Sequence, residues 1–119
     1  MKIYTSYFGN VDKLPKDITP IAICGKRPEW WKGLHYSKLA PKLSFFLVWK
    51  QTQDNDYYIK HFKEEVLDRL DVKKVLDDLA NLSNCEDVAL ICYETPEKFC
   101  HRHLVADWLI KNGYNCEEI

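Results

Sequence analysis

Runs of apolar residues divide the chain into a small number of strands. Three runs are rich in β-branched, aliphatic or aromatic residues and end near turn residues, a pattern typical of strands. They cover Ile3–Phe8, Pro20–Cys24 and Val88–Cys92. The last of them contains no charged residue and no amide, as expected for a strand buried within a parallel sheet. A further short strand is expected over residues 114–119.

Helical spacing of apolar residues fills the middle of the chain. Asp54 or Asn55 is expected to cap a helix that runs to about Leu70, with aromatic and aliphatic residues along one face. Asp71 is expected to cap the next helix. The stretch Leu43–Lys50 fits a strand or a helix, and the spacing of its apolar residues favours a helix on balance.

A last helix is expected after the third apolar run. Thr95 and Pro96 are typical of a helix start, so this helix is predicted from about residue 97 to 111, with Gly113 at its C-terminal cap. Strands at both ends with helices between them predict a small three-layer α/β domain, in which helices flank a mostly parallel sheet. The single domain is expected to span residues 1–119. An all-α fold is the alternative if the short apolar runs are not strands.

The composition is that of one globular domain with a modest core. The 119 residues are 46% hydrophobic and 29% charged, and the formal net charge is −1. This balance gives no general reason to expect nucleic acid or an acidic membrane as a partner. The charge is divided, however, because residues 1–50 hold nine basic and three acidic side chains, whereas residues 51–119 hold eight and fifteen. A basic face and two ordinary solvated surfaces both explain this division.

Five cysteines without a compact disulfide spacing point to a reduced protein. No signal peptide is recognised at the N-terminus, and no apolar run approaches the roughly 18 residues of a membrane span. A cytoplasmic protein with free thiols is therefore expected, and a membrane is not expected as a partner.

Reactive side chains gather between the third strand and the last helix. Cys92 ends the strand, and Glu94, Cys100, His101 and Arg102 follow it. In an open parallel sheet, ligands bind where a strand ends and its helix begins. On the predicted helix, His101 shares the buried apolar face, and helical side chains tilt toward the N-terminus. His101 is therefore expected beside Cys92 and Glu94, whereas His103 projects to the opposite side and is expected to be solvated.

Two chemistries that need no metal fit these residues. In the first, Glu94 acts as general base or nucleophile, His101 acts as acid or base, and Arg102 holds an anion. In the second, Cys92 or Cys100 is a reactive thiol activated by a helix N-terminus and a neighbouring cation. The predicted helix puts Cys100 about one turn inside its N-terminus, where the helix dipole is weaker. A purely structural reading is equally open, with His101 as a hydrogen-bonding group and Arg102 paired with Glu94.

A metal is the third possibility. Cys92, Cys100 and His101 are zinc-type ligands, and Cys24 ends another strand at the same expected edge. No CxxC or HxxxH pair is present, and adjacent residues on a helix point about 100° apart. Metal ligation is therefore disfavoured, and the sequence identifies no cofactor.

A basic, aromatic segment follows the second strand and is a candidate for the same edge. Trp30, Trp31 and Tyr36 can stack on a planar ligand such as a base, while Lys26 and Arg27 can meet phosphate. The segment is then a lid over the site. The alternative is that the tryptophans close the open end of the core, because aromatic side chains bury large areas.

The chain resembles the large bacterial and viral family called domain of unknown function 488. The resemblance lies in an apolar strand that ends in Cys92-Tyr-Glu94, a proline, and Cys100-His-Arg102 before a helix, and Tyr36–Pro41 matches a further segment. It covers most of the chain, but only the Cys-His-Arg block is specific. The resemblance implies a compact α/β fold and marks Cys92, Glu94, Cys100, His101 and Arg102 as the family signature. It implies no reaction, and Cys24–Pro28 departs from the Asp-Val-Arg strand end of many members.

The leading functional expectation is a small enzyme that acts on a nucleotide-like or other anionic metabolite at the C-terminal edge of the sheet. A non-catalytic module that binds nucleic acid or protein through residues 26–42 is the first alternative. A Cys-His-Arg motif with a purely structural role is the second. Neither the reaction nor the oligomeric state follows from the sequence.

Overall fold

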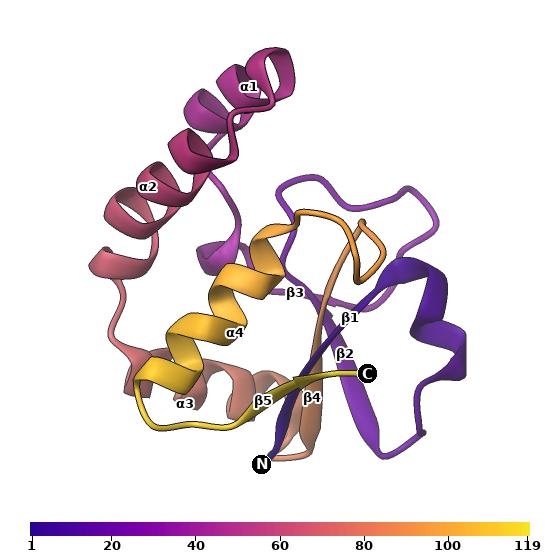
Figure 1. Cartoon of the computed structure of the whole chain (residues 1–119). Coiled ribbons are helices and arrows are strands. Elements are labelled where there is room, and N and C mark those ends of the chain that lie inside the picture. The colour runs from indigo at the N-terminus through magenta and orange to yellow at the C-terminus, as the bar shows by residue number, and fades with distance from the viewer.

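A five-stranded, wholly parallel sheet organises the chain (Figure 1). The computed structural model describes residues 1–119. The strands are Ile3–Tyr7 (β1), Ile18–Ala22 (β2), Leu34–His35 (β3), Asp87–Cys92 (β4) and Cys116–Glu118 (β5), in the spatial order β3-β2-β4-β1-β5. The apolar strand β4 is therefore central and is buried along all but its first residue.

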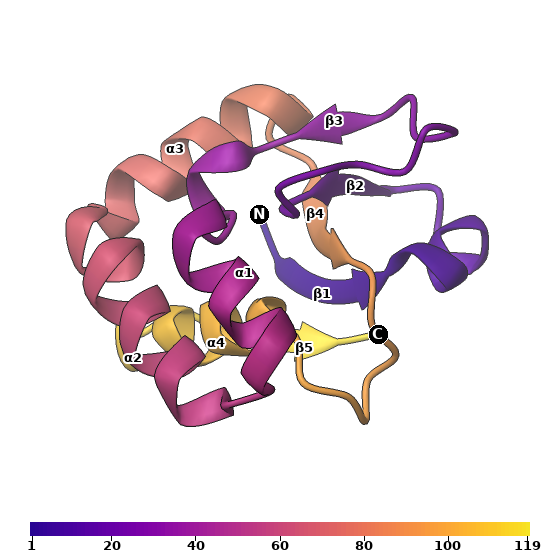
Figure 2. The same cartoon turned by 90° about the horizontal axis from the view of Figure 1, so that it is seen from above.

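The helices form a layer on one side of this sheet. They are Leu43–Thr52 (α1), Asn55–Glu65 (α2), Val72–Ser83 (α3) and His101–Lys111 (α4), with 3-10 turns at Phe8–Lys13 (η1), Ser37–Leu39 (η2) and Leu67–Arg69 (η3). All four α-helices gather on the side away from η1 (Figure 2). The opposite face is covered by η1 together with Trp31, so the predicted three-layer α/β architecture is confirmed.

Alternation along the strands divides the core into two parts. Ile21 and Leu90 point into the larger cluster, which the helices complete with residues such as Phe62, Leu79 and Leu109. Their strand neighbours point into the smaller cluster on the η1 side, which consists of Phe8, Ile18, Ala22, Cys24, Ala89, Ile91, Cys92 and Cys100. Cys92 and Cys100 therefore belong to the smaller cluster, at the C-terminal edge of the sheet.

Most helix boundaries follow from the predicted caps. The Asp54 carboxylate accepts a hydrogen bond from the backbone N–H of Tyr57 at 3.1 Å, and Asp71 accepts one from Lys73 at 3.0 Å. The ambiguous stretch at 43–50 is helical, as the spacing favoured. Gly113 follows the last helix with a φ of 90°, a left-handed conformation that glycine adopts without strain.

The predicted start of the last helix is wrong. Helix α4 begins at His101 rather than at about residue 97, and Cys100 is its N-cap, with extended φ and ψ of −153° and 143°. The Thr95 hydroxyl donates to the carboxylate of Glu97 at 2.6 Å instead of capping a helix. The hydroxyl is therefore turned to Glu97 and does not accept from a backbone N–H in the way that a helix cap requires. Because of this four-residue shift, Cys100 lies at the N-cap of the helix and not in its interior, where the prediction put it.

The second strand also differs from the prediction. Strand β2 runs from Ile18 to Ala22, two residues before the expected range, and contains Pro20. Strand β3 pairs only with Ile21 and Ala22, so β2 has a free edge beside Pro20, where a proline is tolerated in a sheet. None of the helices is both long enough and apolar enough to cross a lipid bilayer.

Candidate functional site

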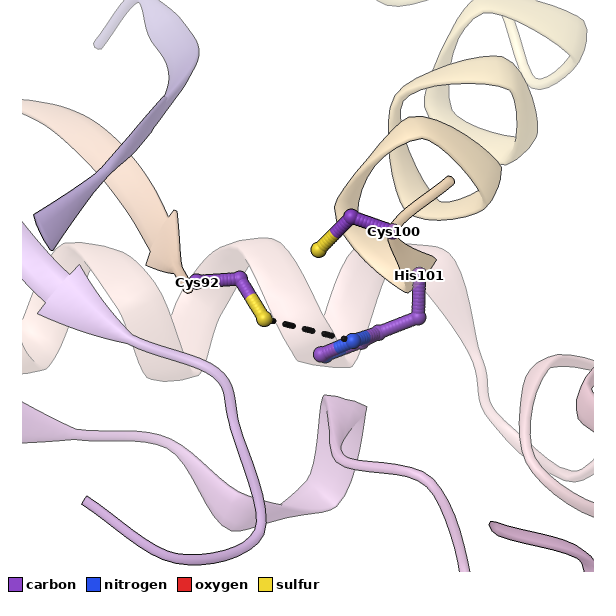
Figure 3. A group of neighbouring side chains, drawn as sticks. All are labelled: Cys92, Cys100 and His101. Carbon is purple, nitrogen blue, oxygen red and sulfur yellow. Dashed lines mark hydrogen bonds between the residues drawn. The ribbon is translucent and has the colours of Figure 1, made fainter. Parts of the chain in front are cut away.

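Three buried side chains meet at the C-terminal edge of the sheet. Cys92 ends β4, Cys100 caps α4 and His101 is its first residue. One ligand atom from each of the three lies within 4.8 Å of those of the other two, and Figure 3 shows the two thiols and the imidazole turned toward one another. Each of these residues is at most 6% exposed. We call these three residues the Cys-His cluster.

The imidazole of His101 is oriented by the main chain. Its Nε2 lies 2.8 Å from the carbonyl oxygen of Ile23, which directly follows β2. A carbonyl only accepts hydrogen bonds, so Nε2 carries the hydrogen and Nδ1 of the neutral ring presents a lone pair. Nδ1 lies 3.5 Å from the Cys92 Sγ atom. His101 therefore lies beside Cys92, at the position that helical spacing predicted.

The two thiols of the cluster differ in acidity. A hydrogen bond from Cys92 lowers the pKa of Cys100, and His101 lowers it further against the effect of burial. The pKa of Cys92 is raised by its hydrogen bond to Cys100 and by burial. The location of Cys100 at the N-cap corrects the expectation that it lies a full turn inside the helix, where the dipole is weaker.

The Cys-His cluster borders two adjoining cavities. The first, of about 350 Å³, is walled by aromatic side chains and is here called the aromatic cavity. Its lining residues are Phe46, Trp49, Lys50, Tyr58, Cys92, Tyr93, Glu94, Phe99, Cys100 and His101. The second, of about 520 Å³, shares Phe46, Lys50, Cys92, Tyr93 and His101 and adds Lys26, among others. The Tyr93 hydroxyl donates to the carbonyl of Lys26, so the loop after β4, which borders both cavities, is tied to the loop after β2, which borders the second.

Arg102 has a different environment from His101, its neighbour in the sequence. Its side chain is fully buried, and its Nε and Nη2 donate to the two carboxylate oxygens of Glu118 at 3.1 and 2.9 Å. Nη1 donates to the carbonyl oxygen of Glu94. Of the two alternatives for Arg102, the structure therefore contains the ion pair, although its carboxylate partner is Glu118 rather than Glu94. Arg102 does not line either cavity.

The tryptophans of the basic, aromatic segment, for which a lid was one of two alternatives, line neither cavity. Trp31 packs edge-on against Phe8 and donates from Nε1 to the Leu34 carbonyl, and Trp30 also contacts Phe8 while remaining 58% exposed. Tyr36 is buried and donates its hydroxyl to Asp78.

The basic residues of the same segment share a polar hollow beside Trp31, which both Lys26 and Arg27 line. Of the two, only Lys26 also lines the second cavity. His103, expected in solvent, is half-buried and its Nε2 is shielded from solvent.

Sequence reasoning missed the wall of the aromatic cavity. Phe46, Trp49 and Lys50 come from one face of α1, at spacings of three and four residues. This spacing was the available signal, but it is also the pattern of a helix that packs on a core. Trp49 and Phe99 come from elements 50 residues apart in the sequence and pack with ring centroids 5.6 Å apart, a juxtaposition that only the fold determines.

Comparison with known proteins identifies the family. The chain matches the family model described as the active DUF488-N3 subclade over residues 9–113. The match spans most of the chain, so the protein belongs to the DUF488 family, as the resemblance of its Cys-His-Arg segment indicated. No curated protein and no solved structure matches the chain.

Proposed function

We propose that this member of the DUF488 family is a small enzyme that acts on a planar, anionic, nucleotide-like metabolite in the aromatic cavity. One observation carries the proposal: the buried Cys-His cluster opens to a cavity that has aromatic walls and a lysine. Concave apolar sites with a few convergent polar groups are the usual form of small-molecule sites.

The walls of the aromatic cavity suit a flat ligand. Phe99 packs edge-on against Tyr58 with ring centroids 5.1 Å apart and tilts toward Trp49, which leaves the wall apolar and rigid. A base or another planar ring can stack on such a surface. The volume of about 350 Å³ falls within the usual range of about 300–1,000 Å³ for ligand sites.

The charged groups of the two cavities suit an anion and an acid–base step. Lys50 lines both cavities and is the cation that faces the proposed ligand, while Lys26 lines only the adjoining second cavity, and Arg27 and Arg102 are not required for this role. Glu94 lines the aromatic cavity beside the cluster. Its main chain is held by Arg102 through the hydrogen bond to the carbonyl oxygen. We assign Glu94 as the general base and the Cys-His cluster as the reaction centre.

Replacement of the proposed base tests the assignment. Wild-type protein is incubated with a library of nucleotides and other anionic metabolites, and consumption is followed by mass spectrometry. Glu94→Gln is expected to lower turnover by at least about 100-fold, the lower end of what a general base contributes. The control is Glu64→Gln, an exposed carboxylate on α2. Equal turnover by Glu94→Gln and wild type, or consumption of no library member, contradicts the proposal.

Two tryptophans provide a matched test of the binding surface. Trp49 borders the aromatic cavity, whereas Trp30 is exposed outside it. Trp49→Ala is expected to weaken ligand binding by roughly 10-fold, since base–aromatic stacking contributes about 1–3 kcal/mol. Trp30→Ala is expected to leave the affinity unchanged. The affinities of both variants are measured by isothermal titration calorimetry with the metabolite found in the library. A larger loss of affinity in Trp30→Ala than in Trp49→Ala indicates that the ligand binds at the Trp30 segment instead.

Exposure of Trp30 favours a second candidate function, a module that binds nucleic acid. Lys26, Arg27 and Lys32 lie exposed in the same segment. If the protein is such a module, its affinity for nucleic acid falls steeply with salt concentration, because binding of the phosphates releases counterions. Reversal of the three charges then abolishes binding of a single-stranded oligonucleotide, while affinity that is insensitive to salt excludes this function.

A further inference from the structure

We propose that Cys92, Cys100 and His101 hold a zinc ion whose fourth coordination position faces the aromatic cavity. Two thiolates and one imidazole are an established zinc ligand set for sites that keep one position open. The three residues are buried and line the aromatic cavity, so the open position is directed at the proposed ligand. Binding of the metal does not depend on the proposed function, whereas its use in a reaction rests on that function.

The separations between the ligand atoms suit tetrahedral zinc. Bonds of about 2.3 Å to sulfur and about 2.0 Å to nitrogen put a sulfur about 3.6 Å from the nitrogen and two sulfurs about 3.8 Å apart. Cys92 Sγ and His101 Nδ1 are 3.5 Å apart, and all three ligand atoms are within 4.8 Å of one another. Small side-chain adjustments are enough to bring them into the coordination sphere.

The surroundings of His101 are those of a metal ligand. A ligating histidine usually donates its second ring N–H to a carbonyl or carboxylate, which fixes the tautomer and the ring plane. His101 donates from Nε2 to the Ile23 carbonyl at 2.8 Å, so the lone pair on Nδ1 is turned toward the thiols. The hydrogen bond that normally orients a zinc-ligating histidine through its other nitrogen is therefore already present.

Cys100 is placed as a ligand rather than as a helix cap. Its side chain makes no capping hydrogen bond, although the N-cap is the position where a side chain normally accepts one. Its sulfur points toward Cys92 instead (Figure 3). The sequence objection that adjacent helical residues diverge by about 100° does not apply, because Cys100 has an extended backbone and only His101 is helical.

Charge also balances in the loaded site. Two thiolates neutralise Zn²⁺, so the buried site carries no net charge, which avoids the cost of an unpaired buried ion. The nearest buried cation, Arg102, is neutralised separately by Glu118. Cys24 lies at the neighbouring strand end and borders the second cavity, but it is not among the three converging ligands. A bound ligand can therefore occupy the fourth position, where zinc acts as a Lewis acid.

Cobalt provides a test that needs no variant. Reduced, metal-free wild-type protein is titrated with Co²⁺, and the absorption spectrum is recorded. We expect thiolate-to-cobalt charge-transfer bands and intense d–d bands of a tetrahedral site, which saturate at one ion per chain and disappear when Zn²⁺ is added. A spectrum of octahedral aqueous cobalt, or bands that Zn²⁺ does not displace, overturns the inference.

Variants then identify the ligands. Cys100→Ser and His101→Ala are expected to weaken zinc binding by more than about 100-fold, since loss of a supporting outer contact alone costs about 10–100-fold. Cys85→Ser is the control, because Cys85 is exposed and outside the cluster. Circular dichroism checks that each variant is folded. Equal loss of zinc by the control, or full retention by folded Cys100→Ser, contradicts the assignment.

The two proposals fail in different ways. If wild-type protein binds zinc but neither binds nor converts any metabolite, the metal site is supported and the proposed enzyme function is contradicted. If wild-type protein binds no zinc but Glu94→Gln lowers turnover, the enzyme function is supported and the metal site is contradicted. The zinc content of wild type and the turnover of the Glu94 variant are therefore measured on the same preparations.

Discussion

His101 and Arg102 are adjacent in the sequence, both are buried, and their surroundings differ. The Arg102 guanidinium donates to Glu118 and to the Glu94 carbonyl, so protein groups engage it from both sides. His101 is anchored at one nitrogen by the Ile23 carbonyl, while the other nitrogen faces two thiols at a cavity. Within the same sequence block, Arg102 is thus held entirely by protein groups, whereas His101 keeps a nitrogen that is available to a ligand.

Burial alone therefore does not distinguish a structural residue from a functional one. Both side chains are at most 5% exposed. What differs is whether the partners of each polar atom come from the fold or remain available to a ligand. Arg102 joins α4 to the terminal strand β5, where Thr5 also donates to Glu118 at 2.6 Å. The role that we assign to Arg102 is therefore to fix the loop and helix that present His101 and Glu94.

The largest expected effect is on stability, from removal of the Arg102 guanidinium. Arg102→Met leaves the carboxylate of Glu118 with only its hydrogen bond from Thr5 and leaves the carbonyl of Glu94 without its donor. Loss of one partner of a buried ion pair costs about 3–5 kcal/mol, and we expect a value near the lower end because Glu118 is 25% exposed. Urea denaturation measures the change.

Two further variants sharpen this result. Removing both charges in Arg102→Met/Glu118→Leu is expected to recover part of the loss, since no unpaired carboxylate remains. Lys63→Met breaks the exposed pair with Asp68 and is expected to cost at most about 1 kcal/mol. A cost for Arg102→Met as small as that for Lys63→Met contradicts the structural assignment.

Removal of the His101 imidazole is expected to have a smaller effect on stability. His101→Ala leaves the Ile23 carbonyl without its donor, which costs about 1–3 kcal/mol. The variant should therefore fold, melt at a lower temperature than wild type and bind no zinc. Thermal unfolding and metal analysis of one sample measure both effects. A large loss of stability with unchanged zinc and metabolite binding makes the histidine purely structural.

The smallest expected effect is on the pH dependence of stability. Burial disfavours the Glu118 carboxylate, but hydrogen bonds from Arg102 and Thr5 outweigh burial and lower its pKa. The folded state therefore binds this proton less readily than the unfolded state. The stabilisation is complete above the unfolded pKa of about 4.3 and is lost as the pH falls through the lower, folded value.

Glu118→Gln is expected to remove this component. The free energy of unfolding, measured by urea denaturation at several acidic pH values, should fall less steeply with decreasing pH in the variant than in wild type. Glu117→Gln, an exposed neighbour on β5, should retain the wild-type slope. Equal slopes for wild type and Glu118→Gln contradict the assigned ion pair.

Much of the fold could be predicted because its signals are local. Asp54 and Asp71 cap helices as expected, and the apolar strand at 88–92 lies at the centre of the sheet. The start of α4 could not be predicted from Thr95 and Pro96, because Thr95 bonds to Glu97 and the cap is the buried Cys100, a residue type without a capping preference. Strand β3 has two residues and carries too little pattern to be recognised.

The candidate site was only half predictable. His101 and Cys92 could be brought together because strand order and helical spacing fix both. The partner of Arg102 could not, since Glu118 is 16 residues away and reaches it only through the pairing of β5 with β1. The aromatic wall came from α1 instead of the tryptophan pair, because Trp30 and Trp31 pack against Phe8 and line neither cavity.

Native mass spectrometry of wild-type protein, purified without chelator under reducing conditions, tests the central claim most directly. The mass of the native protein is compared with that of the denatured chain. The account predicts an excess equal to one zinc ion, which His101→Ala abolishes and Lys63→Met retains. A native mass equal to that of the denatured chain, even after zinc is added back, contradicts the claim that the Cys-His cluster is a metal centre.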